Sequence, residues 1–153
     1  MVAQLLGTLF LLLAVGTPHL TMATSASPTP AAPATPGSTI KLFVDVIPDP
    51  KVHVYAPGAK DYLPIALEVM PAAGITVGKL TYPKAQDLYF EPLKEHVPVF
   101  SAPFRLAQDV AIGRAVKRGQ SLIVTGVLKY QACDDTICFN PVTAPVSWTV
   151  AIK

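Results

Sequence analysis

The sequence predicts an all-β fold, an immunoglobulin-like β-sandwich of about seven strands, from three observations. From Ile40 onward, short runs of β-branched and aromatic residues are separated by Pro and Gly, which is typical of strands and turns. Residues 40–47 alternate between apolar and polar side chains, as a half-buried strand does. No segment is a convincing helix, so crossover connections between parallel strands are not expected. A small β-barrel is the alternative arrangement.

The expected strands follow one another through the rest of the chain. The first, 40–47, places its alternate apolar residues on one face and ends before the Pro-Asp-Pro sequence at 48–50. In the last, Trp148 alternates with Val146 and Val150, which places the indole in the predicted core. Short turn sequences that contain Gly separate several of the strands. The remaining strands are predicted at 52–55, 63–70, 75–82, 102–107 and 121–131.

One segment, 83–98, does not fit the strand pattern. It contains three prolines and no sustained alternation, and it carries large apolar side chains at Tyr89, Phe90 and Leu93. It is therefore predicted to be an irregular loop, and loops of this length tend to be functional or disordered.

The N-terminal region differs in composition, since every Lys, Arg, Asp and Glu lies beyond residue 40. The apolar run from Leu5 to Val15 is shorter than the roughly 20 residues that span a membrane, and small residues follow it. Residues 1–23 are predicted to be a signal peptide, with a mature N terminus between Thr24 and Ser27. An uncleaved anchor is the alternative, because the first four residues contain no Lys or Arg.

The Pro/Ala/Ser/Thr-rich residues 24–39 are predicted to form a linker, and residues 40–153 the folded domain. The formal net charge is only +2 and the basic residues are scattered, which argues against nucleic-acid binding. An exported chain reaches an oxidising compartment, where two cysteines are expected to pair.

Cys133 and Cys138 are separated by four residues, a spacing that fits neither a CxxC redox motif nor a zinc knuckle. A disulfide that closes so small a ring contributes about 2 kcal/mol, against about 5 kcal/mol for a ring of roughly 100 residues. This favours a working disulfide over a structural one. Two alternatives remain: a passive binding or assembly module with a structural disulfide, and Cu(I) binding by the cysteines with His53 or His96.

The run YQACDDTICFNPVTAPVSWTV and the earlier HVYAPGAKDYLPIALEV resemble the N-terminal periplasmic domain of the DsbD thiol:disulfide interchange family. In that family a strand that ends in Tyr-Gln leads into the first cysteine, a polar loop follows, and proline trails the second cysteine. The matching residues here are Tyr130, Gln131, Cys133, Cys138 and Pro141. The resemblance covers residues 40–153, essentially the whole predicted domain.

The resemblance implies a periplasmic immunoglobulin-like domain that acts as a component of a protein-disulfide reductase. Such a domain takes reducing equivalents from a membrane-embedded thiol-disulfide donor and passes them to exported thioredoxin-like acceptors. No cofactor, metal, nucleic acid or small-molecule substrate is expected.

The resemblance also assigns roles to individual residues. Cys138 is implied to be the interchange sulfur and Cys133 its resolving partner, and Tyr55 falls at the position of an active-site tyrosine, although simple strand packing would also explain it. The family's aromatic cap loop is implied to correspond to segment 83–98 and to shield the pair, with Tyr89, Phe90 or Leu93 as the shielding side chain. The carboxylates that follow Cys133 agree with the cysteine order, because a partner thiolate should approach the sulfur farther from them.

Overall fold

The structure, a computed structural model, describes residues 16–28 and 33–153. All regular elements in these residues are β-strands, and every ladder between them is antiparallel. The predicted all-β, immunoglobulin-like fold is confirmed. The strands are β1 (Gly16–Thr17), β2 (Leu20–Pro28), β3 (Thr39–Pro48), β4 (His53–Tyr55), β5 (Ala66–Val69), β6 (Ile75–Thr81), β7 (Gln86–Phe90), β8 (Glu95–Phe100), β9 (Phe104–Ile112), β10 (Ser121–Tyr130), β11 (Ala132–Cys133) and β12 (Val142–Ala151).

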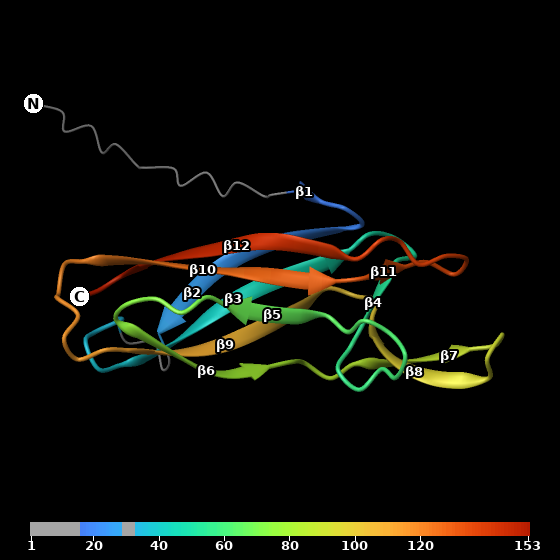
Figure 1. The fold of residues 1–153 in the computed structure, drawn as a ribbon, viewed down its shortest axis with the longest axis horizontal. Helices are drawn as coiled ribbons and strands as arrows, with labels where there is room; N and C mark the ends of the chain where they lie inside the picture. Colours follow the sequence, from blue (N-terminus) through green and yellow to red (C-terminus); the bar gives the residue numbers. More distant parts are fainter. Residues whose placement is uncertain (1–15, 29–32) are drawn as a thin grey trace, which may run out of the picture.

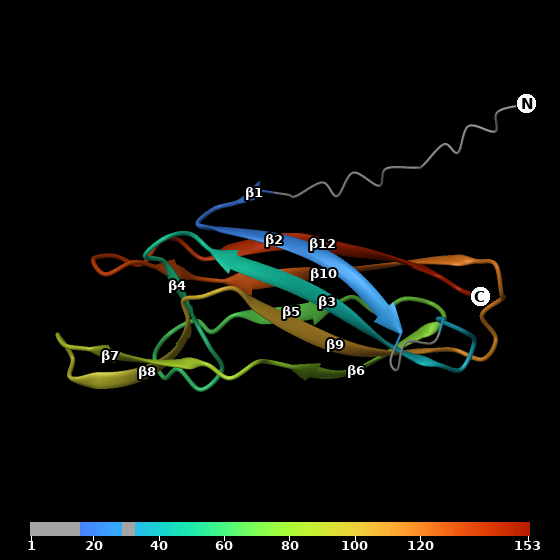
Figure 2. The ribbon, with the colours of Figure 1, turned by 180° about the vertical axis from the view of Figure 1, so that it is seen from behind.

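Three sheets make up the fold. One has the strand order β1-β2-β3-β9-β6 and the second the order β12-β10-β5. These two lie on opposite sides of the molecule, as the front view in Figure 1 and the rear view in Figure 2 show together. The third sheet, β11-β4-β8-β7, lies at one end of the long axis, on the right in Figure 1.

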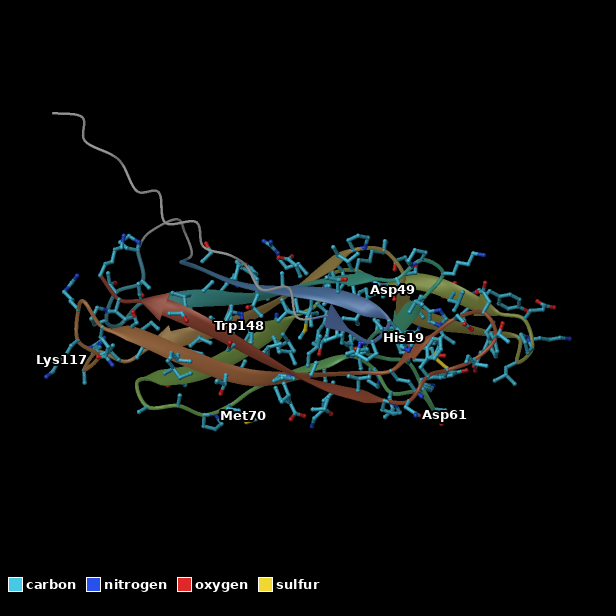
Figure 3. All side chains as sticks on the ribbon, turned by 90° about the horizontal axis from the view of Figure 1, so that it is seen from above. His19, Asp49, Asp61, Met70, Lys117 and Trp148 are labelled. Atoms are coloured by element: carbon cyan, nitrogen blue, oxygen red, sulfur yellow. A yellow bond between two sulfur atoms is a disulfide. The ribbon has the colours of Figure 1, made fainter. Side chains whose placement is uncertain are left out.

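The core lies between the two long sheets and follows directly from strand periodicity. In β3, β10 and β12 every second residue is buried, so each strand directs its apolar side chains inward. Trp148 on β12 is buried as predicted, and its indole N–H donates a hydrogen bond to the Phe43 carbonyl oxygen at 2.9 Å. The indole therefore joins β12 to β3 across the sandwich. Figure 3 labels Trp148.

The folded domain begins earlier in this structure than the sequence predicted. The predicted linker starts at Thr24, whereas β2 runs from Leu20 to Pro28 and pairs with β3 along nine residues. Leu20 and Met22 lie in the core. The remaining β2 side chains are small, and their pairing rests on backbone hydrogen bonds, which a pattern of large apolar residues does not reveal. The predicted apolar run from Leu5 to Val15 lies outside the described residues.

The segment 83–98 also differs from the prediction. It is not an irregular loop but most of a β-hairpin, in which β7 pairs with β8 from Gln86↔Val99 to Phe90↔Glu95. Pro92 lies in the tight turn, where Leu93 N donates to the Phe90 carbonyl at 3.2 Å. Pro98 lies within β8 just beyond the last β4–β8 pair, Tyr55↔Val99, and its carbonyl oxygen accepts a hydrogen bond from Ala56 N at 2.9 Å. Within the described residues no helix is long and apolar enough to cross a membrane.

Candidate redox site

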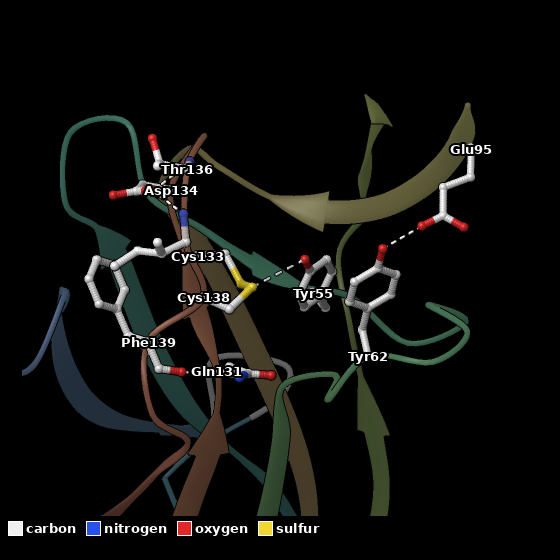
Figure 4. Close-up of a disulfide and its surroundings, with 10 residues drawn as sticks. Tyr55, Tyr62, Glu95, Gln131, Cys133, Asp134, Thr136, Cys138 and Phe139 are labelled. Carbon is white, nitrogen blue, oxygen red and sulfur yellow. Dashed lines mark hydrogen bonds between the residues drawn. A yellow bond between two sulfur atoms is a disulfide. The ribbon is translucent and has the colours of Figure 1, made fainter. Parts of the chain in front are cut away.

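Cys133 and Cys138 form a disulfide across a small β-hairpin, so the predicted pairing is confirmed. The two residues face each other as an isolated antiparallel bridge, with a Cα–Cα distance of 4.0 Å. Backbone hydrogen bonds flank the pair on both sides, from Phe139 N to Ala132 O and from Asp134 N to Ile137 O, each 2.9 Å long. The cysteines therefore occupy a non-hydrogen-bonded position, where opposed side chains are closest. Figure 4 shows the disulfide and its neighbours.

The two cysteines differ sharply in exposure. Cys133 is 1% exposed and packs in a small cluster with Tyr55, Val97 and Val99, whereas Cys138 is exposed. Exchange requires an attacking thiolate to reach the disulfide, so access is a condition for either sulfur to react with another protein. In this arrangement Cys138 is the cysteine that a partner can reach.

The tip of the hairpin is held by Asp134. Its Oδ1 accepts hydrogen bonds from the backbone N–H groups of Ile137, at 2.8 Å, and Thr136, at 2.7 Å. These bonds stabilise the carboxylate and lower the pKa of Asp134 below its ordinary value. The side chain that the sequence suggested only as a source of negative charge is thus also the residue that shapes the turn before Cys138.

Tyr55 contacts the exposed cysteine. Its phenol oxygen lies 3.7 Å from Cys138 Sγ, and its ring stacks on Tyr62 at a centroid distance of 4.2 Å (Figure 4). Burial, and secondarily the charge of Glu95, raises the pKa of Tyr55, so the phenol stays protonated and can donate to a thiolate. The Tyr62 hydroxyl donates to the Glu95 carboxylate, which raises the pKa of Tyr62 to about 12.

The site is a cleft of about 270 Å³ built on one face of the β11-β4-β8-β7 sheet. Tyr55 on β4 and Val97 on β8 line its base, and the cysteine hairpin forms one wall. Leu88 and Phe90 of β7 form the opposite wall, because β7 and β11 are the two edges of this sheet. The disulfide thus faces an apolar hairpin across a short sheet.

The structure brings only some of the predicted supporting residues into the cleft. Phe90 and Tyr89 line it, whereas Leu93 is 63% exposed in the turn and lies outside the lining. Tyr130 is buried in the main core, and its hydroxyl donates to the Pro18 carbonyl oxygen at 2.8 Å. Gln131 braces the hairpin instead, since its Nε2 donates to the Phe139 carbonyl oxygen at 3.1 Å.

Sequence reasoning missed Tyr62, Glu95 and Leu88, which complete the cleft or hold its tyrosine pair. Tyr62 lies inside the segment that carries the family resemblance, but only the fold brings it against Tyr55. The residues that the structure describes contain no cluster of three or more His, Cys, Asp or Glu side chains arranged to hold a metal ion. His96, one candidate Cu(I) ligand, contacts Asp87 on the exposed side of the β7–β8 hairpin.

Comparison with known proteins points to one family. The family model described as "Thiol:disulfide interchange protein DsbD, N-terminal" matches residues 23–148. The N-terminal periplasmic domain of ScsB from Proteus mirabilis is similar in fold, with a TM-score of 0.58 and 11% identity over 92% of this chain and 51% of that one. This chain therefore spans about half the length of the ScsB domain.

A second solved structure is the DsbD N-terminal domain of Neisseria meningitidis in the reduced form. It has a TM-score of 0.46 and 19% identity over 69% of this chain and 74% of that one. No curated protein matches the chain.

Proposed function

This chain belongs to the family of N-terminal domains of the thiol:disulfide interchange protein DsbD, and from that membership we propose that it exchanges disulfides with partner proteins in the cell envelope. Cys138 is the sulfur that forms the mixed disulfide, and Cys133 is the sulfur that resolves it. The observation that carries the proposal is the difference in exposure between an accessible Cys138 and a buried Cys133 in one disulfide.

The proposed exchange proceeds in two successive steps. In the reduced domain the Cys138 thiolate attacks a disulfide of the acceptor, forms a bond to one acceptor sulfur and releases the other as a thiolate. The Cys133 sulfur then attacks Cys138, which restores the intramolecular disulfide and releases the acceptor as a dithiol. Two electrons have passed from the domain to the acceptor.

The partners are proposed to be proteins with thiols or disulfides of their own. An exported thioredoxin-like protein accepts the electrons, and a membrane-embedded dithiol donor reduces the Cys133–Cys138 disulfide again. The cleft supports this choice, because its apolar wall at Leu88 and Phe90 stands beside the exposed sulfur and offers a surface for a partner to contact.

Trapping with single-cysteine variants tests the function and the assignment of the two sulfurs. With Cys133→Ser, Cys138 can still form a mixed disulfide that nothing resolves, so adducts with envelope proteins should accumulate in the native host. With Cys138→Ser, the remaining thiol is buried and few adducts should form. Non-reducing electrophoresis followed by mass spectrometry measures both.

Two outcomes would count against the proposal. Equal trapping by the two variants, or trapping by Cys138→Ser alone, would show that the roles are assigned wrongly. Absence of adducts with both variants, together with a disulfide that resists the glutathione pool, would instead favour a passive module with a structural disulfide.

A further inference from the structure

His53 is the cross-strand neighbour of the buried cysteine. In the ladder between β4 and β11, Cys133 pairs directly with His53, and the adjacent pair is Ala132 with Val54. Directly opposed residues of antiparallel strands project from the same face, with Cβ atoms about 4.5–5.5 Å apart. Val54 and Ala132 point into the main core, whereas His53 and Cys133 both line the cleft. The imidazole therefore lies on the same face of the sheet as the Cys133 sulfur, directly across the ladder from it.

The imidazole of His53 is buried, and no hydrogen bond within the described residues occupies its ring nitrogens. His53 is 8% exposed, its ring lies edge-on to Tyr55 at 5.5 Å, and residues 16–28 and 33–153 supply no hydrogen bond to its nitrogens. Burial lowers the pKa of His53 from 6.5, and the charges of Asp135 and Asp134 oppose that shift. The ring is thus neutral near neutral pH, and the two carboxylates stabilise the imidazolium once it forms.

The resolving step needs a proton acceptor at this position. Only a thiolate attacks a disulfide, and Cys133 is enclosed by Tyr55, Val97 and Val99, surroundings that disfavour the charged form of a thiol. Cys138 is exposed and can lose its proton to water. Cys133 is enclosed, so its proton must pass to a neighbouring group.

We propose that His53 accepts the proton of the Cys133 thiol as that thiol resolves the mixed disulfide; this inference rests on the proposed function. The S–H bond of Cys133 breaks as its proton moves to the imidazole. The Cys133 sulfur bonds to Cys138 Sγ, and the bond from Cys138 to the partner breaks. The partner leaves as a thiolate, which takes the proton back from the imidazolium directly or through water, so His53 returns to its neutral form.

Reaction of the reduced full chain with the aromatic disulfide DTNB separates the two steps in one trace. The first thiolate is released when Cys138 attacks, at a rate proportional to DTNB concentration. The second is released when Cys133 resolves the adduct, at a rate independent of DTNB concentration. Stopped-flow absorbance records both phases.

His53→Gln and His53→Phe should slow the concentration-independent phase by at least about tenfold near pH 7, because general bases typically contribute about 100- to 10,000-fold. The concentration-dependent phase should stay within about twofold of the wild type, since Cys138 does not need the imidazole. His96→Gln is the matched control, because that histidine is exposed on β8, and it should change neither phase.

The pH profile distinguishes proton transfer from packing. As the pH is lowered, the rate of the resolving step in the wild type should stay constant until the pH reaches the lowered pKa of His53. At lower pH the rate should decrease, because the ring is already protonated. The variants should lose rate steadily as pH falls from about pH 10 and should match the wild type at about pH 10, where the thiol ionises unaided. The titratable and charged groups that face or surround His53 are Tyr55, Lys51, Asp87, Asp134 and Asp135.

Two results would overturn the inference and leave the proposed function standing. One is an unchanged second phase in both folded variants, and the other is a slower second phase with the same pH profile as the wild type. If the variants do not fold, a wild-type profile without a fall below the His53 pKa overturns it equally. Loss of both phases in the wild type would mean that Cys138 does not react, which is a failure of the proposed function.

Discussion

The hydroxyl of Tyr55 is the side-chain group that contacts the exposed sulfur of Cys138. Its oxygen lies 3.7 Å from the sulfur, and burial keeps it protonated. A hydrogen bond donated to the thiolate favours the charged form and therefore favours attack by Cys138 at neutral pH. The stacked Tyr62, held by Glu95, keeps the Tyr55 ring in place.

We expect Tyr55→Phe to slow alkylation of Cys138 by iodoacetamide about three- to tenfold near pH 7, because the thiolate loses a donor. The measurement uses the Cys133→Ser background, so that one thiol reacts. Tyr82→Phe is the control, since its hydroxyl bonds the Ile65 carbonyl and does not line the cleft. Equal rates in the Tyr55 variant and the control would show that Tyr55 only packs.

The β7–β8 hairpin forms the wall of the cleft opposite the disulfide. Leu88 pairs with Val97 in this hairpin, so both side chains face the cysteine cluster, and Phe90 lies two residues further along the same face. The residues predicted to form the cap are therefore positioned by strand pairing and not by an irregular loop. Leu93, in the turn, is exposed and does not line the cleft.

Phe90→Ala should raise the rate at which Cys138 is alkylated in the reduced protein by about two- to fivefold, since part of the wall is removed. Leu93→Ala, which also truncates an apolar side chain of the same hairpin but lies outside the cleft lining, should leave the rate unchanged. Peptide mass mapping after a short pulse of alkylating agent measures both. The same rate in wild type and Phe90→Ala would contradict a shielding role for Phe90.

The strands that the sequence predicted correctly are those in which large apolar residues alternate, such as β3, β10 and β12. Strands β2 and β7 escaped prediction because their side chains are small or mostly exposed, and pairing to a neighbour decides their structure. The cysteine pair was predictable from spacing, export and resemblance. The pairing of His53 with Cys133 was not predictable, because it depends on the register between two strands that are distant in the sequence.

The N-terminal segment, residues 16–28, packs against both the core and the hairpin that carries Cys133 and Cys138. Leu20 and Met22 of β2 are buried in the sandwich. The ring of His19 stacks on Phe139, just after Cys138, at a centroid distance of 3.7 Å. The backbone of His19 accepts a hydrogen bond from Asp49 N at 3.0 Å, and Figure 3 places these two residues close together.

Thr24 is the first residue of the range predicted for the mature N terminus. A chain that begins there should have a free energy of unfolding about 3–5 kcal/mol lower than a chain that begins at Gly16, because it lacks the two buried apolar side chains of β2. Urea unfolding measures the difference. The double substitution of Leu20 and Met22 by Ala should reproduce most of it, whereas Thr21→Ala, at an exposed position, should not. Equal stability of the two chains would show that β2 contributes little, and intact mass from the host would show where processing occurs.

The hairpin that carries the disulfide is already closed by its own backbone hydrogen bonds on either side of the two cysteines. Breaking the S–S bond therefore releases almost no chain, and the oxidised and reduced forms should share one overall shape. The two forms would then differ in the Cys133–Cys138 bond and not in the conformation of the backbone. A partner protein that binds only one of the two forms would therefore have to distinguish them at the Cys133 and Cys138 sulfurs.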